Sequence, residues 1–124
     1  MKKIFTILAL IFTISAFAQN SDAVVGALKS GDATKFTSFF DNAVDVKLPK
    51  QTEMQNASKN DATSAIKSFF STNSISGFEV ISQREMSGTM YIAGKLKSTS
   101  GDYNITVMLK NKNNQDMIIT VRIN

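Results

Sequence analysis

The last third of the chain alternates apolar and polar residues, which is the pattern of strands with one buried face. The clearest segment is Tyr103–Lys110, where odd positions are apolar and even positions are mostly polar. Phe78–Arg84, Met90–Lys97 and a last segment predict three more strands. A loop of odd length is expected before the last segment. The odd positions of that segment are then expected to face inward, and they are Met117, Ile119, Val121 and Ile123.

Two helices are predicted near the N-terminus. Ser21 is expected to cap the first, whose apolar stripe comprises Ala23, Val24, Ala27 and Leu28. Gly31 suits the left-handed position that ends a helix. Asp32 is then expected to cap a short second helix that carries Phe36, Phe39 and Phe40.

A short strand and a third helix are predicted in the middle of the chain. The strand is Ala43–Leu48, which Pro49 ends, and a hairpin return strand is expected around Met54. Ser58 or Asn60 is expected to cap the helix. Its core-facing stripe follows the helical period: Ala62, Ala65, Ile66, Phe69 and Phe70.

The order of these elements predicts an α+β fold in one domain, residues 19–124. About three N-terminal helices would pack on an antiparallel β-sheet. Residues 1–18 are expected to form a cleaved signal peptide, with Lys2 and Lys3, an apolar run, and a small-x-small ending at Ala18. The apolar run is shorter than the roughly 20 residues that a membrane span needs. We therefore expect an exported protein, periplasmic or secreted, that has no membrane span after cleavage.

Composition excludes several kinds of chemistry. The sequence has no cysteine and no histidine, so thiolate sites and the usual neutral-pH base are missing. Without Lys2 and Lys3, the chain has 12 basic and 10 acidic residues, which gives a net charge of +2. That excess is small and scattered, so we expect no binding of nucleic acid.

The remaining chemical motifs are weak. Ser64 and Lys67 match a Ser-x-x-Lys pattern, but its companion motifs are missing and a solvated helix face is the simpler interpretation. Asp41 and Asp45 could approach each other, but they match no calcium-loop pattern, and two solvated acids beside a strand are the simpler interpretation. No acidic residue lies on a predicted apolar stripe, and Tyr103 continues the core face of its strand. We therefore assign no catalytic, cofactor-binding or metal-binding residue and expect no cofactor.

The outer face of the predicted sheet is the candidate interaction site. Two lysines alternate on one strand, and no acidic residue is expected among the basic ones. An apolar centre with a basic rim would suit a second copy of the chain or an anionic envelope component. The candidate residues are Tyr91, Lys95, Lys97, Met108, Lys110, Ile118 and Arg122. The alternative is a solvated face whose lysines prevent aggregation.

Three stretches resemble a family of small exported bacterial proteins, domain of unknown function 4783. They are Ala27–Asp32, Ala65–Phe70 and Tyr91–Ile123. The order of elements also resembles the nuclear transport factor 2-like (cystatin-like) superfold, which implies a curved sheet wrapped around the helices as a cone.

The resemblance leaves two functional classes open. The first is a non-catalytic module of the envelope that binds a small ligand in the cone or a partner protein, including a homodimer through the sheet face. The alternative is a small isomerase or hydrolase that uses Asp or Tyr in the cone pocket. Catalytic members of the superfold use sets that include histidine, which this chain lacks.

Overall fold

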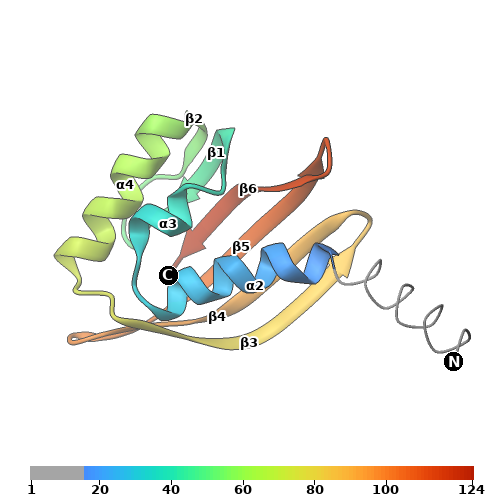
Figure 1. Cartoon of the computed structure of the whole chain (residues 1–124). Helices are drawn as coiled ribbons and strands as arrows, with labels where there is room; N and C mark the ends of the chain where they lie inside the picture. Colours follow the sequence, from blue (N-terminus) through green and yellow to red (C-terminus); the bar gives the residue numbers. More distant parts are fainter. Residues whose placement is uncertain (1–15) are drawn as a thin grey trace, which may run out of the picture.

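The computed structural model describes residues 16–124, with side chains from Ser21 onward (Figure 1). Most of the predicted signal peptide, residues 1–15, lies outside the described residues. The elements follow in this order: α2 (Ala16–Lys29), α3 (Ala33–Thr37), β1 (Phe40–Lys47), β2 (Met54–Ser58), α4 (Lys59–Thr72), β3 (Gly77–Met86), β4 (Thr89–Ser98), β5 (Gly101–Lys112) and β6 (Gln115–Ile123).

The strands form one six-stranded sheet in the order β2-β1-β6-β5-β4-β3. All neighbouring pairs are antiparallel except β1 and β6, which run parallel, so the sheet is mixed rather than purely antiparallel. The helices cover one face of the curved sheet: α2 packs on the β3 side, and α4 packs on the side of β1 and β2 (Figure 1). The α+β class expected from the sequence is confirmed.

The first helix begins earlier than expected. Ser21 does not cap α2 but lies inside it, with 2% of its surface exposed, because neither glycine nor proline occurs between Ala16 and Ser21 to stop the helix from starting earlier. The predicted end is confirmed. Gly31 has φ +67°, and the amides of Gly31 and Asp32 donate to the carbonyls of Leu28 and Ala27, which is a Schellman ending.

The other predicted caps are also present. The Asp32 carboxylate accepts a hydrogen bond from the Lys35 amide at the start of α3. The Ser58 hydroxyl, rather than Asn60, accepts one from the Asp61 amide at the start of α4. These side chains satisfy amides that have no partner within the helix. The hairpin return strand expected around Met54 is β2.

The prediction for the last strand is wrong in its first half. Lys112 pairs with Gln115, so the turn at Asn113 and Asn114 has two residues rather than an odd number, and both have positive φ. Such turns match the twist of a hairpin. A two-residue turn places Leu109 opposite Ile118, which is therefore fully buried.

A β-bulge at Ile119 then restores the expected alternation. The register shifts between Met108 and Leu109, so that Met108 pairs with Thr120 and Val107 pairs with Val121. Val121 and Ile123 face inward as predicted, whereas the predicted inward residues Met117 and Ile119 remain half-buried.

Gly94 in the middle of β4 lies where another element approaches closely. A Cβ atom at this position would lie 2.1 Å from the carbonyl oxygen of Glu79 and 2.6 Å from the ring of Phe78. β3 has a bulge opposite, between Val80 and Ser82. Both consequences that a mid-strand glycine suggests, a bulge and a close approach, are therefore present.

Aromatic side chains fill the space between the helices and the sheet. The Phe36 ring meets Phe40 edge-on at a centroid distance of 5.6 Å and stacks on Phe70 at 6.0 Å. Phe36 and Phe40 are fully buried. The interior of the cone is thus packed with side chains at this point. Within residues 16–124, no helix has the length and apolar character to cross a membrane.

Candidate functional site

The outer face of the sheet carries six of the seven residues proposed from the sequence. The strand register places Tyr91 directly opposite Met108, with Arg84 beside Tyr91 and Thr120 beside Met108. Asp45 of β1 completes this row across five strands. Tyr91 and Met108 are both half-buried, so they form a small apolar centre between cationic and anionic ends.

Ile118 does not belong to this face. Its side chain is 0% exposed, because the two-residue turn before β6 directs it into the core. Sequence reasoning also missed Arg84, whose position opposite Tyr91 depends on the register between β3 and β4. The irregular pattern of β3 gave no signal for this register.

Acidic residues neutralise part of the expected basic rim. Lys97 Nζ lies 3.0 Å from Asp102 Oδ2 and 3.7 Å from Glu79 Oε1, and Arg122 Nη2 lies 3.4 Å from Glu53 Oε1. The hydrogen bond to Asp102 raises the pKa of Lys97. The expectation that no acid lies among these bases is therefore wrong. It failed because β5 extends back to Asp102, and because β3 and the segment before β2 contribute acids of their own.

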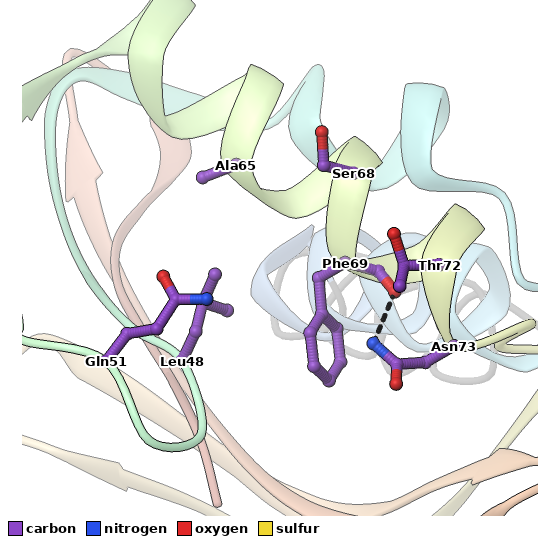
Figure 2. Close-up of a pocket in the computed structure, with 7 residues that line it drawn as sticks. All are labelled: Leu48, Gln51, Ala65, Ser68, Phe69, Thr72 and Asn73. Atoms are coloured by element: carbon purple, nitrogen blue, oxygen red, sulfur yellow. Dashed lines mark hydrogen bonds between the residues drawn. The ribbon is translucent and has the colours of Figure 1, made fainter.

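A cleft of about 220 Å³ opens between α4 and the connection from β1 to β2 (Figure 2). Phe69 forms an aromatic wall, and Leu48 and Ala65 add aliphatic surface. The polar lining residues are amides and hydroxyls: Gln51, Ser68, Thr72 and Asn73. None of the seven lining side chains titrates near neutral pH. The cleft therefore suits a small neutral group and offers no general acid or base.

Hydrogen bonds hold the wall of the cleft in place. Asn73 Nδ2 donates to the carbonyl of Phe69 at 2.9 Å, as Figure 2 shows, and Asn73 Oδ1 accepts from the Tyr103 hydroxyl at 3.0 Å. The Tyr103 ring meets Phe69 edge-on at 5.2 Å. Tyr103 thus lies on the core face of its strand, as predicted. It supports the cleft wall and is not one of the cleft's lining residues.

The other polar residues singled out in the sequence have structural surroundings. Ser64 and Lys67 are both exposed on α4. Asp41 pairs with Lys112, and the hydrogen bond from Lys112 lowers the pKa of Asp41. Asp45 Oδ1 accepts from the Asn56 amide at 2.8 Å. Among the described residues, no three potential ligands gather as a metal site would require.

Residues 21–124 match the model of a family described as Domain of unknown function (DUF4783). The chain belongs to the DUF4783 family. A DUF4783 family protein from Bacteroides ovatus is 28% identical, covers 82% of this chain and 90% of its own, and superposes with a TM-score of 0.73. No curated protein matches the sequence.

More distant structures show the fold alone. An NTF2-like protein of unknown function from Pseudomonas putida is 12% identical, with 88% of this chain and 83% of that chain covered and a TM-score of 0.66. A putative ketosteroid isomerase from Parabacteroides distasonis is 18% identical, with coverages of 90% and 83% and a TM-score of 0.59. This DUF4783 protein thus shares the fold of these NTF2-like structures.

Proposed function

We propose that this DUF4783 protein is an exported, non-catalytic binding module whose cleft beside α4 takes a small, neutral, largely apolar group. The observation that carries the proposal is the lining of the cleft, which combines the Phe69 ring with amides and hydroxyls and contains no titratable side chain. The alternative is a small enzyme that uses Asp or Tyr in the pocket. Neither residue type lines this cleft, which favours binding over catalysis.

Benzyl alcohol, benzoate and benzylamine form a probe set that tests this cleft by NMR titration. The three share one ring and differ in charge, and the uncharged lining predicts that benzyl alcohol binds at least tenfold more tightly than either ion. Ala65→Leu should abolish binding, because the added carbons fill the cleft that Ala65 lines. Ser64→Leu, on the exposed side of the same helix, is the matched control. Equal binding of the three probes, or binding that survives Ala65→Leu, would refute the proposal.

Export rests on the pattern of residues 1–18. The positive start, the apolar run and the Ala16-Phe17-Ala18 ending are features that a signal peptidase accepts. We expect the exported chain to begin at Gln19. Mass spectrometry of protein recovered from the envelope or the medium measures this directly, and a chain that retains residues 1–18 would contradict it.

A second candidate function is pairing with another copy through the outer sheet face. A two-fold axis along the strands, between β4 and β5, would set Tyr91 on Met108 of the second copy, twice by symmetry. An axis across the strands, along the row through Tyr91 and Met108, would instead set Arg84 against Arg84 and Asp45 against Asp45. The repulsion between these like charges favours the axis along the strands. An anionic partner is less favoured than a second copy, because Lys97 and Arg122 already have acids beside them.

Light scattering of the wild type and of Met108→Asp tests this pairing. The wild type should have the mass of a dimer and the variant that of a monomer, because the new carboxylate would be buried against the second copy. Asn104→Asp, at an exposed position on the same strand, is the matched control. A monomeric wild type would leave the face as solvated surface. Neither result affects the cleft.

A further inference from the structure

A second cavity, of about 440 Å³, lies where the end of α3 and the start of α4 approach the start of β6. This volume falls in the range of roughly 300–1,000 Å³ that is usual for small-molecule sites. The cleft beside α4, at about 220 Å³, falls below it. The lining residues are Ser38, Phe39, Lys59, Asn114, Gln115, Asp116 and Met117.

Asp116 is the unusual residue of this cavity, because its acidic side chain is only 5% exposed. The register that turns Ile118 into the core turns Asp116 to the same face, opposite Asn111. The expectation that no acid would lie on an apolar stripe is therefore wrong at this position. Asn111 Nδ2 donates to Asp116 Oδ1 at 2.9 Å and fixes the carboxylate. A carboxylate has about four acceptor positions, so it accepts further donors while this bond is kept.

Lys59 supplies the opposite charge on the other wall of the cavity. It is the first residue of α4 and is half-buried, and it forms no ion pair within residues 21–124. The two walls are joined directly, since the amide of Ile118 donates to the carbonyl of Phe39 at 2.7 Å. Phe39 and Met117 add apolar surface between the charges.

We propose that this cavity binds a zwitterion of the free amino acid class with an apolar side chain. The ligand's ammonium group donates to Asp116, its carboxylate meets Lys59, and its side chain lies against Phe39 and Met117. A simple anion would be repelled by Asp116, and a simple cation would be repelled by Lys59. The site is separate from the cleft beside α4 and goes beyond the function proposed for it.

Isothermal titration calorimetry with three methionine compounds tests the two charged contacts separately. L-Methionine carries both charges, N-acetyl-L-methionine lacks the ammonium group, and L-methioninamide lacks the carboxylate. We expect L-methionine to bind at least tenfold more tightly than either derivative, because each derivative loses one of the two charge-assisted contacts with the cavity. Equal affinities, or no binding of L-methionine at millimolar concentration, would overturn the proposal.

Two variants assign the contacts to residues. Asp116→Asn keeps the size of the side chain and an oxygen for Asn111, and should weaken L-methionine binding at least tenfold. Lys59→Met should do the same and remove the preference for L-methionine over its amide. Lys67→Met, an exposed lysine of the same helix, is the matched control and should bind normally.

These variants also separate this site from the cleft. Circular dichroism shows whether Asp116→Asn folds. Lys59→Met tests the proposal independently, because the Lys59 side chain is half-exposed and its replacement should leave the fold intact. Ala65→Leu should leave L-methionine binding unchanged. Unchanged affinity in both Asp116→Asn and Lys59→Met would overturn the assignment whatever the result at the cleft.

Discussion

Replacing Gly94 by alanine should destabilise the fold by about 2 kcal/mol. The added methyl group would lie 2.1 Å from the carbonyl oxygen of Glu79 and 2.6 Å from the Phe78 ring, both far inside van der Waals contact. Overpacking a core usually costs about 1–3 kcal/mol, and the upper end applies here because one of the clashing atoms belongs to the backbone. The lower entropy of unfolded alanine offsets about 0.4–1 kcal/mol of this loss.

The same substitution at Gly26 is the matched control. Gly26 is exposed in α2, and a Cβ built there would meet no atom within 4 Å beyond its chain neighbours and the backbone of its own helix. Alanine should therefore stabilise the protein by up to about 1 kcal/mol, because of its higher helix propensity. The two glycines thus predict opposite signs for one chemical change.

Urea unfolding followed by far-UV circular dichroism measures both free energies, which suits a chain without tryptophan. A second variant, Gly94→Ala with Phe78→Leu, should recover only part of the loss, because the Glu79 carbonyl cannot move aside like a ring. If Gly94→Ala unfolds within 0.5 kcal/mol of the wild type, a threshold near the usual effect of a surface substitution, the close approach of β3 to β4 is wrongly described.

Three further changes test other parts of the fold. Phe69→Ala should cost about 3–5 kcal/mol of unfolding free energy, as for other buried phenylalanines, whereas Lys67→Ala should change little; equal shifts in the urea midpoint would contradict the stripe on α4. Ile118→Asp should abolish cooperative unfolding, because it buries an unpaired charge, and a stable variant would contradict the β6 register. Lys112→Met should cost about 0.2–1 kcal/mol at pH 7. Since the pair lowers the pKa of Asp41 below 3.8, this difference should vanish as the pH falls through that lowered pKa, and a difference that persists in acid would contradict the pairing.

The sequence predicts well what depends on neighbours along the chain. The stripe of α4, the caps at Asp32 and Ser58, and the ending at Gly31 each need only a few residues to specify them. The turn from β4 to β5 is equally local, since Ser98 pairs with Gly101 across Thr99 and Ser100. Local hydrogen bonds and spacing carry this information.

Contacts between distant segments account for what the sequence did not predict. The parallel pairing of β1 with β6 joins segments about 75 residues apart and leaves no local pattern. The ion pairs of the outer face depend on strand ends, because Asp102 joins β5 only when the strand extends beyond its apolar residues. Six of the seven candidate residues therefore lie on the outer face, while the basic charge of that face was overestimated.

The turn and the bulge of the last hairpin are best understood together. Apolar residues occupy positions 117, 118, 119, 121 and 123, so the composition of β6 permits either alternation. The two-residue turn selects even positions for the interior, and the bulge at Ile119 returns the odd positions to it. A turn of odd length without a bulge would bury Met117 in place of Ile118 and expose Asp116. The buried carboxylate, and with it the charged cavity, is thus a consequence of the choice of turn, since the side-chain period of a strand is two and one residue of shift exchanges its faces.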